Sequence, residues 1–350
     1  MSAPFFSICI PQYNRTDFLI AACRSFASQT FRDFEVCISD DCSNDGKEQD
    51  LIAYLQASGM RNRYRRNEKN LRYDGNLRSA IELSTGRYLV LMGNDDGLAS
   101  PDVLERLHQE IQRAGDIAVA ITNYREVPTG RRYDRMGKTG VLGAGPELAA
   151  AMFRNYSFVS GIVLDGPGAR ALASPIIDGS EMYQMYLGTR LVAAGGRCLS
   201  VAEVMVDKDL QIAGQDVESY RARPRLDPCP IVKRALPMGR LLEVVSQGLR
   251  PHTSPTDLDR LLFSVGRDLY RYTYPFWGIE YRRVQSWRYA LGVIWGLSPA
   301  EVAAHQGLSR ARLALLWLIY AVTSSAALLA PIALFDTLRP HLYELAKRRR

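Results

Sequence analysis

The chain has 350 residues, of which 47% are hydrophobic and 23% are charged. This balance is typical of globular proteins and excludes a disordered chain, and the length suffices for one large domain or for a catalytic domain with an accessory part. The net charge of +7 suits nucleic acid, anionic lipid or a phosphorylated substrate and does not choose among them.

The cysteine pattern excludes a zinc site and a disulfide framework. No two cysteines form a CxxC pair, and none has zinc-ligand spacing to a histidine. We expect reduced thiols that pack in the core of a cytosolic domain. The apolar stretch 5–11 is too short for a signal peptide. The six cysteines are Cys9, Cys23, Cys37, Cys42, Cys198 and Cys229.

Short β-rich runs alternate with helical patterns in the first part of the chain, which predicts an α/β fold with a mostly parallel sheet. Polar clusters at 11–15, 40–45 and 93–96 each follow a predicted strand. Ligands of such sheets bind beyond the carboxyl ends of the strands, so the three clusters predict one site. The predicted strands are 5–10, 34–39, 64–66, 88–92, 117–122 and 157–164, and the predicted helices are 17–29, 47–58, 76–84 and 179–195.

The alternation fades after about residue 210. Four prolines, Pro224, Pro228, Pro230 and Pro237, indicate a linker over 216–256. Residues 257–350 are predicted to be helical, and their aromatic residues interleaved with arginines suit a membrane interface. An ordinary helical subdomain also fits this composition.

One segment of this region, residues 313–335, contains no charged residue. A helix of that length covers about 34 Å, enough to cross a bilayer core. Arg310 and Arg312 precede it, and Arg339 and the basic cluster 347–350 follow it. A span and a re-entrant helix bent near Pro331 both fit, and a buried core helix is the alternative.

Three motifs carry a resemblance to a known family. They read I-P-Q-Y-N-R at residues 10–15, Q-T-F-R-D-F-E-V at 29–36 and S-D-D-C-S-N-D-G at 39–46. Their order and spacing over residues 1–215 resemble inverting glycosyltransferase family 2. The stretches 70–76 and 93–96 look most similar to its abequosyltransferase-like branch, which builds surface polysaccharides such as O-antigen and lipopolysaccharide. The resemblance implies a GT-A-type domain.

The resemblance implies a nucleotide-sugar site at the predicted sheet edge. Asp40 and Asp41 would accept a hydrogen bond from an N–H of the nucleotide base. The base and the ribose would be flanked by Pro11, Tyr13, Asn14 and Arg15. Arg72 would contact the diphosphate or the base edge. Asn76, Asn94 and Asp96 complete the predicted donor site.

A divalent cation, Mg²⁺ or Mn²⁺, is the expected cofactor because it neutralises the departing nucleoside diphosphate. Asp95 is the first metal candidate and Asp96 the second. Family members commonly have Asp-x-Asp-Asp here, whereas this chain has Gly93-Asn94-Asp95-Asp96. The missing first carboxylate argues against tight metal binding.

An inverting transfer to a hydroxyl needs a general base. The family places it in an acidic pair at the start of a helix, but this chain has Tyr183 and Gln184 at that point. Glu181 and then Asp178 are the nearest carboxylates. Glu181 is also explained as a first-turn residue of a helix starting at Gly179.

The sequence therefore predicts transfer of a sugar from a nucleotide-diphosphate donor to a lipid-linked, polyprenyl-diphosphate saccharide. The reaction is expected at the cytoplasmic face of the inner membrane, with the C-terminal region as anchor and no nucleic-acid partner. A polyprenyl-phosphate monoglycosyltransferase, which needs no hydroxyl base, is one alternative. A catalytically inactive membrane scaffold and a nucleic-acid-binding protein are two others.

Overall fold

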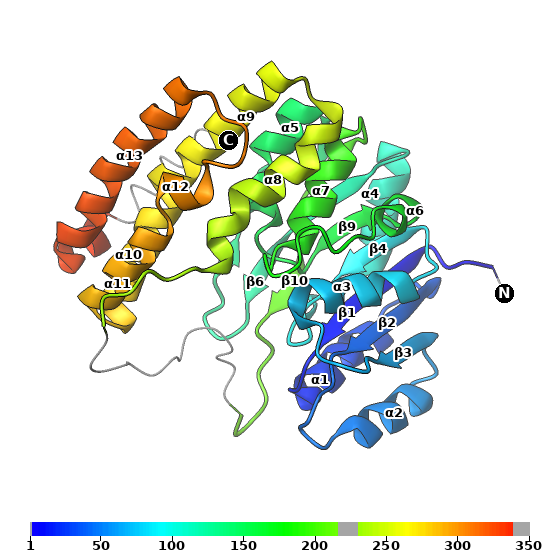
Figure 1. Cartoon of the computed structure of the whole chain (residues 1–350). Helices are drawn as coiled ribbons and strands as arrows, with labels where there is room; N and C mark the ends of the chain where they lie inside the picture. The colour runs from blue at the N-terminus through cyan, green and yellow to red at the C-terminus, as the bar shows by residue number, and fades with distance from the viewer. Residues whose placement is uncertain (1, 216–229, 339–350) are drawn as a thin grey trace. The chain divides into compact units, whose positions relative to one another are not determined.

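The computed structural model describes residues 2–215 and 230–338 of the chain (Figure 1). The chain divides into two units, residues 1–217 and 218–350. The five cysteines of the described residues are free thiols, as predicted, and Cys229 lies outside them.

The first unit is built on a single sheet with the strand order β3-β2-β1-β4-β9-β6-β10-β5. The first four of these strands are mutually parallel, whereas β9 runs antiparallel to both of its neighbours and β6 and β10 are parallel to each other. The sheet is thus mixed but mostly parallel. Its strands are β1 (Phe6–Gln12), β2 (Phe34–Asp40), β3 (Asn62–Arg66), β4 (Tyr88–Leu91), β5 (Gly97–Leu98), β6 (Val119–Glu126), β7 (Arg132–Tyr133), β8 (Gly140–Gly143), β9 (Ile162–Asp165) and β10 (Cys198–Lys208).

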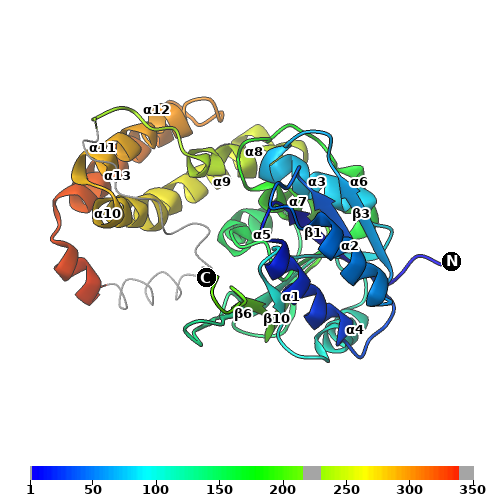
Figure 2. The ribbon, with the colours of Figure 1, turned by 90° about the horizontal axis from the view of Figure 1, so that it is seen from below.

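Helices cover both faces of this sheet. Figure 2 shows α1 and α4 on one side of β1 and α3 and α7 on the other, in agreement with the helix–strand contacts. The helices of the unit are α1 (Thr16–Ala27), α2 (Glu48–Ala57), α3 (Arg72–Leu83), α4 (Val103–Ala114), α5 (Pro146–Ala151), α6 (Gly166–Ala171) and α7 (Tyr183–Ala193), with a 3₁₀ turn η1 (Phe153–Tyr156).

The alternation of side chains along the central strands explains this layering. Even-numbered residues of β1, such as Ile8 and Ile10, join the apolar core that also contains Leu19 and Phe26 of α1. Odd-numbered positions point to the α3 side and include polar residues, of which Ser39 bonds Ser79 of α3. One face is therefore packed by apolar side chains, whereas the α3 face combines apolar packing with a polar network.

Glu35, the acidic residue of the second motif, holds this polar side together. Its side chain is fully buried. It accepts hydrogen bonds from the Ser7 hydroxyl at 2.7 Å, from the Thr85 N–H and hydroxyl at 2.7 and 2.8 Å, and from the Arg63 guanidinium at 2.9 Å. Burial alone would raise the pKa of this carboxyl, but the hydrogen bonds outweigh it and leave the pKa below its ordinary value.

The second unit is helical as far as it is described. Its helices are η2 (Pro237–Arg240), α8 (Leu241–Leu249), η3 (Arg250–His252), α9 (Pro255–Asp268), a π-helical turn η4 (Leu269–Thr273), α10 (Tyr274–Val284), α11 (Trp287–Gly296), α12 (Pro299–Val302) and α13 (Arg310–Leu329).

The predicted linker 216–256 needs correction. Its described part contains α8, whose Leu242, Val245 and Leu249 are fully buried and which packs on α9. The proline-rich pattern concealed this apolar stripe, because Pro230 and Pro237 lie before the helix and not within it. Pro224 and Pro228 lie outside the described residues.

The uncharged segment 313–335 does not form one continuous helix. Helix α13 ends at Leu329, and Ala330 takes an extended conformation before Pro331 because proline disfavours a helical residue ahead of it. Among the described residues, α13 is the one helix long and apolar enough to cross a membrane. Arg339 and the basic cluster 347–350 lie outside the described residues.

We expect Glu35→Gln to lower the free energy of unfolding at neutral pH by about 1–3 kcal/mol, because a buried amide group would replace an acceptor oxygen. The lowered pKa of Glu35 means that its stabilisation is present above its ordinary value of 4.5 and is lost as pH falls through the lowered value. Urea denaturation at neutral and acidic pH should show the difference between variant and wild type shrinking in acid. The exposed pair of Arg65 and Glu82 supplies the control Glu82→Gln, expected within about 0.5 kcal/mol of wild type.

Candidate functional site

The polar clusters that follow β1, β2 and β4 meet at one edge of the sheet. The order β3-β2-β1-β4 reverses direction next to β1, and such a switch point opens a crevice at the carboxyl ends of the strands. The pairing of β1 with β4 stops at Cys9, whereas its pairing with β2 continues to Gln12. Pro11 can therefore end β1 because its missing N–H faces the side where β4 has already stopped.

Gln12 joins these loops. Its side chain is fully buried, and its amide donates to the Asn14 carbonyl at 2.7 Å and accepts from the Asn94 amide at 2.8 Å. Its backbone carbonyl accepts from the Asp41 N–H at 2.8 Å and from the Asn76 amide at 2.9 Å. One residue thus ties the segments after β1, β2 and β4 to helix α3.

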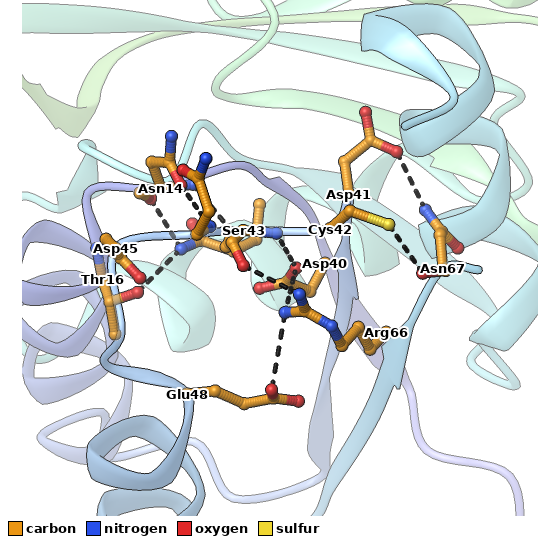
Figure 3. A network of polar contacts seen from close by, with 12 residues as sticks. Asn14, Thr16, Asp40, Asp41, Cys42, Ser43, Asp45, Glu48, Arg66 and Asn67 are labelled. Carbon is orange, nitrogen blue, oxygen red and sulfur yellow. Dashed lines mark hydrogen bonds and ion pairs between the residues drawn. The ribbon is translucent and has the colours of Figure 1, made fainter. Parts of the chain in front are cut away.

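The loops after β1 and β2 are also bonded directly to each other (Figure 3). The Asn14 N–H donates to the Ser43 hydroxyl at 2.8 Å, and the Asn14 side-chain oxygen accepts from the Asn44 N–H at 2.8 Å. Asn14 and Arg15 both have left-handed backbone conformations, with φ of 52° and 58°. This strained turn delivers the chain from β1 into α1 and leaves Tyr13 47% exposed at the edge.

Asp40 and Asp41 are both buried and held by the protein. Asp40 accepts from the Ser43 N–H at 2.7 Å and lies 3.5 Å from the Arg66 guanidinium. Asp41 accepts from the Leu71 N–H at 2.6 Å and from the Asn67 amide at 3.3 Å. In Figure 3 Arg66 lies between Asp40 and Glu48, while Asp41 points to Asn67. The two carboxylates therefore face different neighbours.

The segment after β4 places its two aspartates in different environments. The Arg15 guanidinium donates to Asp95 at 2.7 Å, in a pair with 22% and 16% of the side chains exposed. Asp96 is 2% exposed and accepts from the Ser160 hydroxyl at 2.5 Å and from the Asp209 N–H at 3.0 Å. Asp95 is thus partly exposed and paired with Arg15, whereas Asp96 beside it is buried.

Burial raises the pKa of Asp96 to about 7, and the nearby charge of Asp95 adds to the rise. Burial lowers the pKa of the Arg135 guanidinium to about 10, although the nearby charge of Asp96 opposes the fall. Its guanidinium donates to the carbonyls of Thr122, Phe158 and Ser160 at 2.8 to 2.9 Å. Arg135 therefore stiffens the segment that carries Ser160 behind Asp96.

A divalent cation would find few ligands here. Among the described residues, no group of three or more His, Cys, Asp or Glu could hold a metal ion. A Cβ placed on Gly93 would lie 3.2 Å from an Asp95 oxygen and 3.0 Å from an Asp96 oxygen, so the missing side chain leaves room where the two carboxylates converge. Mg²⁺ commonly takes one or two carboxylates and completes its shell with substrate phosphates and water. The residues fit such a shared site and not an all-protein cage.

The region of the predicted base differs from expectation. Helix α7 begins at Tyr183, not at Gly179, because Gly179 and Glu181 have φ of 85° and 58° and interrupt the helix. Glu181 is therefore not a first-turn helix residue. Asp178 forms a two-pronged ion pair with Arg78 of α3, at 2.6 and 2.9 Å. Both Asp178 oxygens are thus committed to Arg78.

Asp74 of α3 fixes the turn that carries Glu181. It is 1% exposed and accepts from the Glu181 N–H at 2.9 Å and the Tyr183 N–H at 3.0 Å. Burial raises the pKa of the Asp74 carboxyl, and these hydrogen bonds oppose the rise. The Tyr73 hydroxyl donates to Gln184 at 3.0 Å. The N-termini of α3 and α7 are therefore coupled.

The structure gathers the predicted donor-site residues at one edge. Arg72, exposed and in a left-handed conformation, begins α3 beside the Asp41–Leu71 contact. Sequence reasoning missed Gln12, Asp74, Arg135, Ser160 and Asp209. Gln12 lies within a recognised motif, and Asp74 lies within the stretch 70–76. The other three lie far along the chain and gave no local signal.

Residues 7–163 match the family model described as glycosyl transferase family 2. Over these residues, a little under half of its length, the chain is similar to glycosyltransferase family 2. The matched region contains the loops after β1, β2 and β4, and the mixed, mostly parallel sheet with helices on both faces is a GT-A-type fold.

Two curated relatives share part of the glycosyltransferase domain. The abequosyltransferase RfbV of Salmonella typhimurium strain LT2 is 37% identical over 113 residues, which cover 32% of this chain and 34% of RfbV. The Escherichia coli protein WfaP, a UDP-Glc:alpha-D-GlcNAc-diphosphoundecaprenol beta-1,3-glucosyltransferase, is 26% identical over 186 residues, 52% of this chain and 68% of WfaP. The chain thus spans about a third of the length of RfbV.

Solved structures show the same fold at low identity. TarS of S. aureus, residues 1–349 in complex with UDP-GlcNAc, has a TM-score of 0.61 and 14% identity, covering 91% of this chain and 90% of TarS. The mannosyltransferase PcManGT of Pyrobaculum calidifontis, in complex with GDP-Man and Mn²⁺, has a TM-score of 0.53 and 15% identity over 98% of this chain and 86% of its own.

We expect Gln12→Ala to lower the free energy of unfolding of the first unit by about 1–3 kcal/mol, because the substitution removes a buried amide and its hydrogen bonds to the half-buried Asn14 carbonyl and Asn94 amide. Urea denaturation measures the loss. Gln109→Ala, which removes an amide from the exposed face of α4, is the control and should stay within about 0.5 kcal/mol of wild type. Equal, small effects for both variants would refute the role of Gln12.

Asp74→Ala is expected to lower kcat at least tenfold while nucleotide affinity stays within about twofold, because the turn that carries Glu181 loses its two anchors. Asp165→Ala is the matched control, since Asp165 likewise caps a short helix through the Gly168 N–H at 2.7 Å but pairs with Tyr88 at the opposite end of β4. Steady-state kinetics and calorimetric binding separate the two effects. A kcat loss of the same size in both variants would mean that Asp74 acts through stability alone.

Proposed function

We propose that the protein is an inverting glycosyltransferase that moves a sugar from a nucleotide-diphosphate donor to a hydroxyl of a lipid-linked, polyprenyl-diphosphate oligosaccharide. The product would enter surface polysaccharide synthesis of the O-antigen or capsule type. One observation carries the proposal: within the family 2 domain, Gln12 and the Arg15–Asp95 pair join the loops after β1 and β4 at the switch point of the sheet.

The donor site follows from the arrangement of these loops. Asp40 and Asp41 would lie at the base subsite, with Pro11, Tyr13 and Asn14 flanking base and ribose. Arg15 and Arg72 bring positive charge to the edge where the diphosphate would lie. Asn76 and Asn94 would act indirectly, because both donate to Gln12 and so hold the loops that would contact the donor.

The cofactor we propose is Mg²⁺ or Mn²⁺, held by Asp95 together with donor phosphate oxygens, with Asp96 as the second carboxylate. Such an ion would neutralise the charge that develops on the departing nucleoside diphosphate. PcManGT, whose fold is similar, was solved with GDP-Man and Mn²⁺, which supports this choice.

Glu181 is the proposed general base. Both oxygens of Asp178, the other candidate, are engaged by Arg78, so Asp178 is proposed to position the turn and not to take the proton. Asp74 of α3, which begins at the donor edge, would hold the Glu181 turn in place.

The lipid-linked acceptor is proposed from two observations. The printed activity of WfaP concerns a diphosphoundecaprenol-linked sugar. The second unit contains an apolar helix, α13, that is long enough to enter a bilayer. We therefore place the enzyme at the cytoplasmic face of the cell membrane, associated through its C-terminal region.

A polyprenyl-phosphate monoglycosyltransferase remains the second candidate. The commitment of Asp178 to Arg78 favours it, because a phosphate acceptor is already ionised and needs no hydroxyl base. Glu181→Gln distinguishes the two functions. The variant should lose at least a hundredfold in kcat if a hydroxyl is the acceptor and less than tenfold if a phosphate is.

The donor site predicts that one of UDP, GDP, dTDP and CDP binds in a way that Mn²⁺ strengthens. Asp95→Asn should abolish most of the cation-dependent gain, because Asp95 is the partly exposed carboxylate of the pair. Isothermal calorimetry of each nucleotide, with and without Mn²⁺, is the measurement. The variant keeps the shape of the side chain and can still accept a hydrogen bond from Arg15.

Asp116→Asn is the control, since Asp116 is 95% exposed and its partner Arg87 precedes β4 at the far end of the strand. It should bind like wild type. Transfer of sugar from the matching donor to a membrane-lipid acceptor pool then tests the reaction itself. Binding without transfer to any acceptor would indicate an inactive scaffold, and no binding of any nucleotide would contradict the proposed function.

A further inference from the structure

Helix α13 has an exposed apolar face. Four of its five large exposed side chains are Leu315, Leu318, Val322 and Leu329, with 49%, 63%, 62% and 75% of their surfaces accessible, and the fifth is Trp317 at 41%. Spacings of three, four and seven residues place the four aliphatic residues along one stripe of the helix. Beyond Arg312 the helix carries no charge, and only 11% of its most apolar stretch is buried. We call these four residues the α13 stripe.

The other side of α13 is fastened to the helices of its own unit. Near its start, Arg312 donates to Asp259 of α9 at 2.6 Å, and the same carboxylate accepts from the Ser309 N–H at 2.9 Å. Near its end, the Arg282 guanidinium of α10 donates to the carbonyls of Ala327 and Ala330 at 2.6 and 2.8 Å. The helix is thus pinned at both ends by charged side chains.

These attachments oppose a transmembrane course. Helix α10 packs along α13 and carries Glu280, Arg282 and Arg283, the last paired with Asp336 at 2.6 Å. A spanning α13 would have to take these charges into the hydrocarbon core or break every one of the contacts, and both are costly. The attached helix is instead suited to lie along a surface with its stripe outward.

The tryptophans point to the same kind of surface. All four tryptophans of the chain lie in the second unit, at 277, 287, 295 and 317, and each is 38–53% exposed. Trp287 also donates its indole N–H to the Leu328 carbonyl at 3.0 Å, so it lies at the end of α13. Half-exposed tryptophan is characteristic of the headgroup region of bilayers, where the ring meets both apolar and polar surroundings.

The charge of the second unit completes the match. Residues 218–350 contain 20 Lys and Arg against 10 Asp and Glu, a net charge of +10, whereas residues 1–217 contain 24 against 27, a net charge of −3. The basic excess of the whole chain therefore belongs to the unit that carries the α13 stripe. Arg288 and Arg310 are exposed and have no ion-pair partner in the described part of the chain.

We propose that α13 docks in the plane of an anionic bilayer, with the α13 stripe at the boundary between headgroups and acyl chains and without crossing the membrane. Apolar burial supplies the binding energy, and attraction between the basic unit and anionic lipid adds to it. The inference rests on the proposed function only in assuming a membrane-bound acceptor. It replaces the two courses left open for residues 313–335, a span and a re-entrant helix, with a third.

The test is flotation of the full chain with vesicles of phosphatidylcholine, with or without phosphatidylglycerol, after removal of detergent. Wild type should float with the anionic vesicles, and the double variant Leu318→Glu/Val322→Glu should bind at least tenfold more weakly. The control Val141→Glu/Leu142→Glu places two charges on an exposed apolar pair of β8 in the first unit, 43% and 46% accessible, and should float like wild type.

Depth distinguishes docking from crossing. Tryptophan fluorescence should be quenched more by lipids brominated near the headgroup than near the acyl-chain end, and alkaline carbonate should release the bound protein. Deep quenching with resistance to carbonate would establish a span and overturn the proposal. The proposal would also be overturned if the double variant floated as well as wild type. It would be overturned too if wild type failed to float and the α13 stripe instead bound RNA in a salt-sensitive way or joined two copies of the chain.

Nucleotide binding separates this inference from the proposed function. The double variant should bind its nucleoside diphosphate within about twofold of wild type, because the residues of the donor edge all belong to the first unit. Flotation without nucleotide binding in wild type would contradict the proposed function and leave the docking surface intact. Nucleotide binding without flotation would overturn the docking of α13 and leave the proposed function intact.

Discussion

The candidate site depends on the burial of one amide side chain, that of Gln12. Loops at the carboxyl edge of a parallel sheet are separate segments, and each would be mobile without hydrogen bonds to its neighbours. Gln12 supplies those bonds because an amide can donate and accept at once. Its side chain holds the loops after β1 and β4, and its carbonyl holds Asp41 and Asn76. A carboxylate or an apolar residue at this position could not bridge donors and acceptors together.

The same edge shows how neighbouring carboxylates are given different tasks by their surroundings. Asp95 is partly exposed and paired with Arg15, so a cation could reach it from the edge of the sheet. Asp96 accepts hydrogen bonds from Ser160 and the Asp209 N–H, and burial raises its pKa to about 7. Gly93, which stands where family members commonly have an acidic residue, adds space in place of a third charge.

The two units divide the physical work along the chain. The first is close to neutral and joins polar loops at one edge of its sheet, whereas the second is strongly basic and exposes tryptophan and leucine side chains. Such a division suits an enzyme whose donor is a water-soluble nucleotide and whose acceptor is in a membrane. The donor and the acceptor would then each meet a surface of matching polarity.

Much of the first unit could be predicted from its sequence because the determining signals are local. The period-two pattern of residues 6–10 and 34–38 predicted buried strands, and the polar residues that follow them predicted the edge at which the site lies. The motifs at 10–15, 29–36 and 39–46 predicted the family. Even so, the pattern alone did not show that Glu35 is a structural anchor for Ser7 and Thr85, because its partners come from other strands and turns.

Only the tertiary structure decided which carboxylates remain available. Asp178 looked like a candidate base until Arg78, 100 residues earlier, was found to hold both of its oxygens. Asp96, the second metal candidate, was found to be buried and to accept hydrogen bonds from Ser160 and the Asp209 N–H. Helix α8 was hidden among prolines, and the uncharged run 313–335 proved to be a helix interrupted before Pro331 and tied down by Asp259 and Arg282. Sequence patterns report the periodicity and chemistry of one segment, but the partners of a side chain depend on which distant segments the fold brings against it.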